Sequence, residues 1–135
     1  MDKRKIALAK YRLDKSREEL GSSKTLLEKG LYSSSISSSY YSIFHAVRTI
    51  FAFEEIDSKR HSGVIRLFSE RFIKTNLLDT KMKDILAHAF EYRLDSDYED
   101  FYVAEKETAE KQTKNAEYFI NEIIIFCSSH YKVEL

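Results

Sequence analysis

The chain has 135 residues, with 22 Lys plus Arg and 22 Asp plus Glu, so its formal net charge at pH 7 is zero. A chain of this length can bury roughly two-thirds of its unfolded surface in one core, and we expect a single domain spanning residues 1–135. Zero net charge excludes nucleic-acid binding that rests on a global basic excess. Any nucleic-acid site must therefore be local.

Cysteine, proline and glycine usage narrows the protein class. The single cysteine, Cys127, excludes an intrachain disulfide and fits a reducing compartment. No signal peptide and no apolar run near the roughly 18 residues of a membrane span are recognisable, so we expect a cytoplasmic protein without a membrane partner. Proline is absent and glycine occurs three times. This composition predicts an all-α fold, an up-and-down bundle of four to five helices with short connections.

The first predicted helix runs from Ile6 to about Glu28 and is amphipathic. Gly21 lies inside it and weakens it by about 1 kcal/mol relative to alanine, so a bend there is possible. Gly30 is well placed to end the helix. The next stretch, residues 33–53 (SSSISSSYYSIFHAVRTIFAF), has apolar side chains within one helical arc. We expect every other apolar segment to pack against this central helix.

Two further faces of the central helix suggest a packing surface and a candidate binding surface. A ridge of small side chains, along which a neighbouring helix can approach closely, consists of Ser35, Ser39, Ser42 and Ala46. Serine lowers helix propensity, so this segment depends on tertiary packing for its stability. The far side carries an aromatic and basic strip, and its members are candidate ligand-binding residues: Tyr41, His45 and Arg48.

Residues 54–63 read as a polar loop, with Asp57 or Ser62 as candidate N-caps of a short helix. The stripe of that short helix is formed by Val64, Leu67, Phe68, Arg71 and Phe72. Asp79 is the predicted cap of a helix that ends near Tyr98. A last helix starts near Val103 and buries Cys127 as a small core residue.

Arg93 falls near the centre of the apolar stripe of the 80–98 helix, and Asp97 lies one turn further on the same side. A guanidinium keeps its charge and is rarely buried without a partner. On one interpretation Arg93 forms only an ion pair with Asp97, and its replacement lowers stability strongly. On the other it faces a hydrated cleft and binds a phosphate bidentately, so its replacement changes stability little.

The four histidines form no metal-binding pattern. They include no i, i+4 pair, and no cysteine cluster accompanies them, so no metal site is predicted. Glycine-rich phosphate loops are also absent, and no cofactor is expected. His45 on the central helix and His61 at the start of the short helix are the candidates for acid–base chemistry. We expect His88 and His130 to be exposed to solvent.

Three segments, SSSYYSIFHAVRTIF, KRHSGVIRLFSERFIKTNLL and AFEYRLDSDYEDF, occur in this order. Together they resemble the HEPN (higher eukaryotes and prokaryotes nucleotide-binding) family, in particular small stand-alone prokaryotic members with an R-x-x-x-D-Y segment. The resemblance extends from about Ile6 to Ile124. It implies a helical bundle that dimerises so that the two copies of the arginine segment meet in one cleft.

The resemblance also implies two alternative functions. Stand-alone members similar to this chain partner a small nucleotidyltransferase, which implies a regulatory homodimer that presents Arg93, Asp97 and Tyr98 to a nucleotide or RNA, with Tyr98 as acceptor of an AMP group. Ribonuclease members instead carry R-x(4-6)-H. Arg93 matches that arginine, whereas Tyr98, Glu99 and Asp100 stand at the histidine's place. A metal-independent ribonuclease toxin is therefore the alternative, and a helical scaffold without a ligand is a third possibility.

Overall fold

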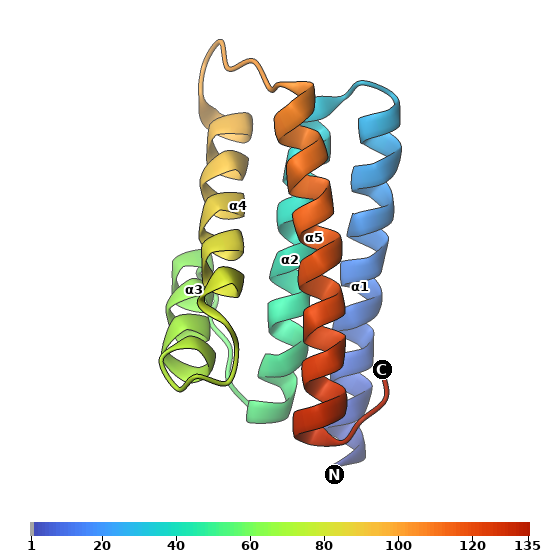
Figure 1. The fold of residues 1–135 in the computed structure, drawn as a ribbon, viewed down its shortest axis with the longest axis vertical. Coiled ribbons are helices and arrows are strands. Elements are labelled where there is room, and N and C mark those ends of the chain that lie inside the picture. Colours follow the sequence, from blue (N-terminus) through green and yellow to red (C-terminus); the bar gives the residue numbers. More distant parts are fainter. Residues whose placement is uncertain (1) are drawn as a thin grey trace.

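The computed structural model describes residues 2–135 of the chain. The described residues form five α-helices and two short π-helical turns, without a β-strand. Their bounds are α1 Lys3–Glu28, α2 Tyr32–Glu54, α3 His61–Phe68, η1 Ser69–Ile73, α4 Thr80–Tyr98, α5 Lys106–Phe126 and η2 Cys127–Tyr131. The four long helices alternate in direction along the chain, and α3 flanks one end of the bundle (Figure 1). The predicted all-α bundle is confirmed.

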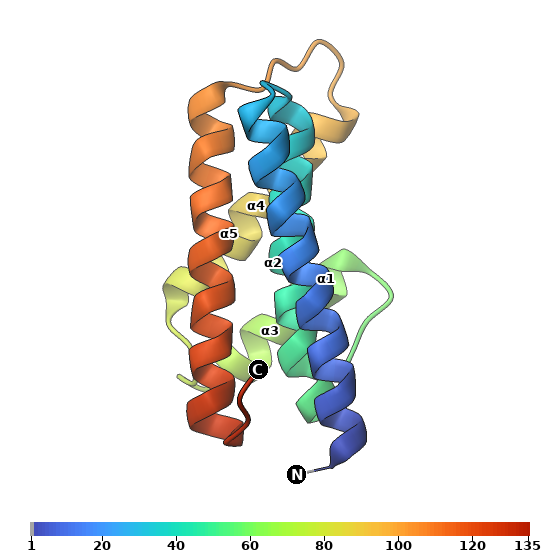
Figure 2. The same cartoon turned by 90° about the vertical axis from the view of Figure 1, so that its right-hand side faces the viewer.

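Helix α2 lies at the centre and contacts the other four α-helices. Figure 1 shows α1 on one side of α2, with α3 and α4 on the opposite side, and in Figure 2 α1 therefore lies in front of α2. The largest fully buried side chains include Tyr40, Phe51, Phe68, Phe72 and Phe119. Cys127 is also fully buried, and burial raises the pKa of its thiol to about 12. The prediction of a small core residue at this position is confirmed.

Several predicted helix ends are confirmed. The Asp79 side chain accepts a hydrogen bond of 2.8 Å from the Lys81 backbone N–H at the start of α4. Gly30 adopts a φ of +75° just after α1, a left-handed conformation that glycine adopts without steric cost. Helix α1 continues through Gly21. His88 and His130 are exposed, as expected.

Other details of the sequence analysis are wrong. Arg60 precedes α3 and supplies no side-chain cap, so neither Asp57 nor Ser62 is the N-cap. Arg71 is exposed and does not belong to a buried stripe. Helix α5 begins at Lys106 rather than near Val103, because the backbone of the preceding residue, Glu105, is extended.

The serine ridge of α2 brings α1 very close. The Ser16 hydroxyl donates to the Ser42 carbonyl over 2.6 Å, and the Ser42 hydroxyl donates back to the Ser16 carbonyl over 2.9 Å. Ser23 and Ser35 make a second reciprocal pair, at 3.0 and 2.9 Å. Side-chain hydroxyls can reach across to backbone carbonyls only when the two helix backbones are close. The predicted close approach is confirmed.

Ser39→Leu tests this ridge. Ser39 is fully buried, with its hydroxyl 2.6 Å from the Ser23 hydroxyl. A larger side chain there must push α1 away from α2, so we expect the free energy of unfolding to fall by about 1–3 kcal/mol. Ser34 is exposed on the same helix, and Ser34→Leu should change stability by less than about 0.5 kcal/mol. Urea unfolding measures the free energy of unfolding of both variants. Equal losses of stability in the two variants would contradict the close packing of α1 against α2.

Candidate functional site

Arg93 is held by side chains from two helices. Its side chain is 13% exposed, and its Nη2 donates a hydrogen bond of 2.8 Å to the Tyr41 hydroxyl. Its Nε lies 3.0 Å from Asp97 Oδ2, but the N–H is not aligned with that oxygen, so this contact is an ion pair rather than a hydrogen bond. The i, i+4 pair predicted from the sequence is therefore present.

Three tyrosine rings surround the Arg93 guanidinium. Its central carbon lies 5.8 Å from the ring centroid of Tyr40, 5.3 Å from that of Tyr41 and 5.5 Å from that of Tyr98. The negative face of an aromatic ring attracts a cation at such distances. We call Tyr40, Tyr41, Arg93, Asp97 and Tyr98 the Arg93 cluster. Helix α2 contributes the first two residues and α4 the other three.

Serine hydroxyls fix the carboxylate side of the cluster. Ser37 donates to Asp97 Oδ1 over 2.6 Å. One turn earlier on α2 and one residue earlier on α4, the Ser96 hydroxyl donates to the Ser33 carbonyl over 3.0 Å. These bonds attach the last turn of α4 to the first turns of α2. As a result, the backbone that carries Asp97 is fixed relative to the rings of α2.

Tyr98 forms the open side of the cluster. It is 68% exposed, although its ring lies against the Arg93 guanidinium. The segment that follows it is also exposed, with Phe101 at 101% and Val103 at 80%. The phenol of Tyr98 is therefore accessible from outside while a positive charge lies beside its ring.

His61 adjoins the cluster, a placement that the sequence analysis missed. It begins α3, as predicted, and its Nδ1 lies 2.5 Å from the Tyr40 hydroxyl. Its ring stacks on that of Phe44 with the centroids 4.5 Å apart. Burial and the positive charge of Arg93 lower the pKa of His61. At neutral pH this imidazole is therefore uncharged and can accept a proton.

The strip predicted on the far side of α2 is not a free face. Tyr41, His45 and Arg48 are each half-buried. Tyr41 belongs to the Arg93 cluster, whereas the other two residues face α1 and the loop after α2. Burial, followed by the charges of Lys15, Arg48 and Arg12, lowers the pKa of His45 to about 4. Its Nδ1 is buried without a hydrogen-bond partner. His45 is therefore a poor candidate for the base.

Arg48 binds the loop after α2. Its Nη2 lies 2.6 Å from Asp57 Oδ2, and its Nε donates to Oδ1 over 3.2 Å. Arg12 of α1 reaches the same Oδ2 at 3.2 Å and donates through Nη1 to the Arg48 carbonyl at 2.8 Å. Burial opposes ionisation of Asp57, but hydrogen bonds from Arg48 and from the Ser58 backbone N–H outweigh it and lower its pKa. Asp57 was predicted as a cap and instead joins α1, α2 and the loop.

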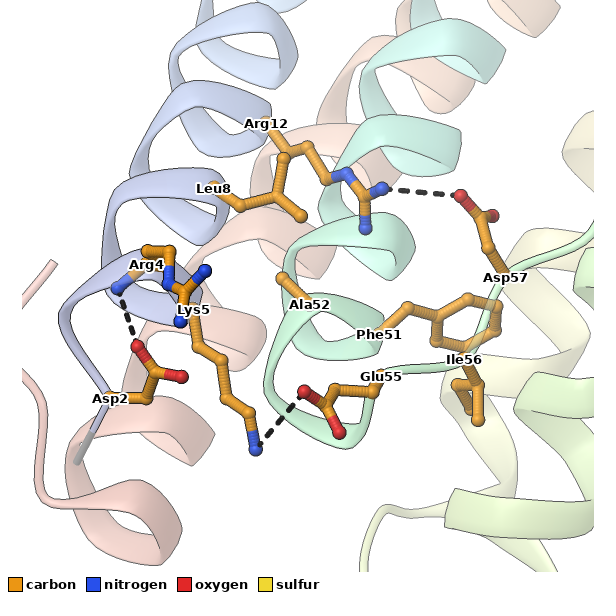
Figure 3. Close-up of a pocket in the computed structure, with 10 residues that line it drawn as sticks. All are labelled: Asp2, Arg4, Lys5, Leu8, Arg12, Phe51, Ala52, Glu55, Ile56 and Asp57. Atoms are coloured by element: carbon orange, nitrogen blue, oxygen red, sulfur yellow. Dashed lines mark hydrogen bonds and ion pairs between the residues drawn. The ribbon is translucent and has the colours of Figure 1, made fainter.

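Two surface hollows lie on either side of Asp57. The first has a volume of about 460 Å³ and lies between the start of α1 and the end of α2 (Figure 3). Its rim carries paired charges, including Lys5 with Glu55 at 3.9 Å and Arg12 with Asp57 at 3.2 Å. The second, of about 680 Å³, is lined by Phe44, Arg48, Asp57, Ser58, Lys59 and His61.

Among residues 2–135, no group of three or more His, Cys, Asp or Glu side chains is arranged to hold a metal ion. None of the described helices is both long and apolar enough to cross a membrane.

Replacing Arg93 by Ala should destabilise the protein, because Asp97 would lose its ion pair and three rings would lose the cation. Asp97 is 31% exposed, so we expect a loss of about 1–3 kcal/mol, less than for a fully buried pair. Asp97→Asn should recover part of it, with a coupling of about 1 kcal/mol in a double-mutant cycle from urea unfolding. The matched control is Arg66→Ala, which breaks an exposed i, i+4 pair with Glu70 and should cost under about 0.5 kcal/mol. Equal losses at both arginines would contradict a structural role for the cluster.

His45 should make stability depend on pH. Its folded-state pKa of about 4 is below the ordinary value of 6.5, so the unfolded chain binds this proton first as the pH falls. The stabilisation is complete above pH 6.5 and decreases toward pH 4, by up to about 1.4 kcal/mol per pH unit. His45→Gln should flatten this decrease in urea unfolding between pH 7 and pH 4.5, whereas His88→Gln, at an exposed position, should leave it unchanged. A wild-type slope in the His45 variant would show that this imidazole is not the cause.

Comparison with known proteins agrees with the resemblance found in the sequence. The family model "HEPN domain" matches residues 9–125. The "Putative toxin MJ0142" of Methanocaldococcus jannaschii is 34% identical over 109 residues, which cover 81% of this chain and 74% of that protein. A "UPF0332 protein" of Archaeoglobus fulgidus is 34% identical over 109 residues, 81% of this chain and 86% of that protein. The "Putative toxin MJ0605" of M. jannaschii is 29% identical over 106 residues, 78% of each chain. Because the family model covers most of the chain, this protein belongs to the HEPN domain family.

Proposed function

We propose that this protein is a homodimeric nucleotide- or RNA-binding partner of a small nucleotidyltransferase, in a pair of the toxin–antitoxin kind. One observation carries the proposal: Tyr98 is 68% exposed while its ring lies 5.5 Å from the Arg93 guanidinium. An accessible hydroxyl beside a fixed cation is what a phosphate-transfer reaction onto the protein requires. Two relatives whose names contain the word toxin add support for the pair.

The proposed reaction transfers AMP to Tyr98. The phenolic oxygen attacks the α-phosphorus of ATP bound to the nucleotidyltransferase, the bond from that phosphorus to the pyrophosphate breaks, and the phenolic proton passes to a base of that enzyme. Arg93 binds the resulting phosphodiester. Within residues 2–135, the Arg93 side chain donates a hydrogen bond only through Nη2, to the Tyr41 hydroxyl. Its Nη1 is therefore free to donate to a phosphate oxygen.

A second copy of the chain completes the proposed cleft. Large apolar side chains rarely lie fully exposed together on a monomer, and an exposed apolar patch marks an interaction site. Phe101 and Val103 are exposed just beyond Tyr98, at the end of the arginine segment. A second copy covering them would bring the two Arg93 clusters together, as the resemblance to the HEPN family implies.

A metal-independent ribonuclease is the second candidate function, favoured by the position of His61. This imidazole binds the Tyr40 hydroxyl through Nδ1, and Arg93 helps to keep it uncharged. Arg93 would bind the scissile phosphate and His61 would accept the proton of the attacking ribose 2′-hydroxyl. The missing histidine of the R-x(4-6)-H pattern would then be replaced by one from α3. RNA cleavage by the protein alone, lost in His61→Asn, distinguishes this function from the first.

Intact-mass spectrometry tests Tyr98 as the acceptor. After co-expression with a small nucleotidyltransferase of the proposed pair, the wild-type protein should gain the mass of at least one AMP group. Tyr98→Phe should gain none, because the oxygen that forms the new bond is absent. Tyr92→Phe is the matched control, since Tyr92 is also exposed on α4, and it should be modified like the wild type. Unmodified wild-type protein beside an active partner enzyme would contradict the proposal.

A further inference from the structure

The hollow beside Phe44 and His61 has the size and lining of a ligand site. It measures about 680 Å³, within the range of roughly 300–1,000 Å³ that is usual for small-molecule sites. Helix α2, the loop after it and the start of α3 contribute its walls. We call it the Lys59 hollow; its lining residues are Phe44, Arg48, Asp57, Ser58, Lys59 and His61.

One wall of the Lys59 hollow is aromatic. The rings of Phe44 and His61 are stacked, with an interplanar angle of 17°, and both residues are half-buried. Tyr40 and Phe90 stack further along the same group, at 5.6 and 6.2 Å from the His61 ring. A supported aromatic surface of this kind accepts a nucleobase, because every base has a π face that can stack on a ring.

The other wall carries an excess of positive charge. Lys59 is exposed and, within the described part of the chain, forms no ion pair. Among the lining residues, Arg48 and Lys59 are basic and Asp57 alone is acidic, so one carboxylate faces two cations. The hollow in Figure 3 differs, because its three basic residues face an equal number of acidic ones. An anion therefore suits the Lys59 hollow and not its neighbour.

The Lys59 hollow is connected to the Arg93 cluster. His61 lines the hollow and contacts the Tyr40 hydroxyl, while the Tyr40 ring lies 5.8 Å from the Arg93 guanidinium. A phosphate held by Arg93 and a nucleoside held in the hollow would thus be neighbours, like successive units of one strand.

We propose that the Lys59 hollow binds a nucleoside monophosphate unit, with its base against Phe44 and His61 and its phosphate near Lys59 and Arg48. The unit is either a free nucleotide or one residue of a single-stranded RNA. This inference deepens the proposed function and rests on it, because it adds a second contact to a nucleotide or RNA ligand.

Binding of two probes to the full-length protein tests the hollow: AMP, and a short single-stranded oligoribonucleotide. Lys59→Glu reverses the free charge and should weaken binding at least tenfold. Phe44→Leu keeps an apolar side chain but removes the aromatic face, and should also weaken binding. Lys114→Glu, at an exposed position on α5, is the matched control and should bind like the wild type. Weakening with both probes indicates a free nucleotide as a ligand, and weakening with the oligoribonucleotide alone indicates an RNA strand.

Two results would overturn the inference. One is wild-type protein that binds neither probe at millimolar concentration, and the other is Lys59→Glu that binds both probes with wild-type affinity. Lys59 is exposed, so its replacement leaves the fold intact and decides the question even if Phe44→Leu fails to fold. Amide chemical shifts during AMP titration should change most at residues 58–61. The mass test of Tyr98 is independent, so modified protein with an unresponsive hollow would remove this inference and leave the proposed function standing.

Discussion

The enclosure of Arg93 is the constraint on which the geometry of the candidate site depends. A guanidinium that is 13% exposed has lost most of its hydration, and this cost must be offset by its neighbours. Asp97 supplies the opposite charge, Tyr41 accepts a hydrogen bond, and three rings surround the cation. A well-packed apolar side chain of similar volume would stabilise this position at least as much, because buried ion pairs seldom stabilise more than such groups. Stability alone therefore does not account for an arginine, which supports the phosphate-binding role that we propose for it.

Helix α2 allows this arrangement because one of its faces packs against α1 and another contacts Arg93. The serine face admits α1 so closely that hydroxyls bond to backbone carbonyls across the interface, as Ser16 and Ser42 do. The opposite face carries Tyr40 and Tyr41, which reach Arg93 on α4. Close packing on one side thus fixes the rings on the other. A site whose side chains are held on packed helices keeps its geometry before a ligand arrives.

Local patterns predicted much of the fold and one half of the site. The spacing of apolar residues predicted the helices, Asp79 predicted the start of α4, and the i, i+4 separation of Arg93 and Asp97 predicted their ion pair. These features depend on neighbours within one or two helical turns. Sequence periodicity carries that information directly.

Features that depend on the tertiary path were missed. His61 meets Tyr40 only because the loop after α2 returns α3 to the aromatic face, and no local pattern encodes that return. Asp57 was predicted as a helix cap because its ion pairs are not visible in the sequence. Arg12 is remote from it along the chain, and Arg48 reaches it only because the chain turns after α2. The left-handed backbone of Phe101, at a φ of 60°, is equally unexpected for a bulky residue.

We propose above that two copies of the chain share one cleft at the Arg93 clusters. Light scattering of the wild type and of Phe101→Glu tests it most directly. The wild type should have about twice the chain mass of 15.9 kDa, and Phe101→Glu should be monomeric, because it places a charge in the proposed contact. Ile125→Glu, at an exposed apolar position on α5, should remain dimeric. A monomeric wild type at micromolar concentration, or a Phe101→Glu variant that stays dimeric, would contradict the claim.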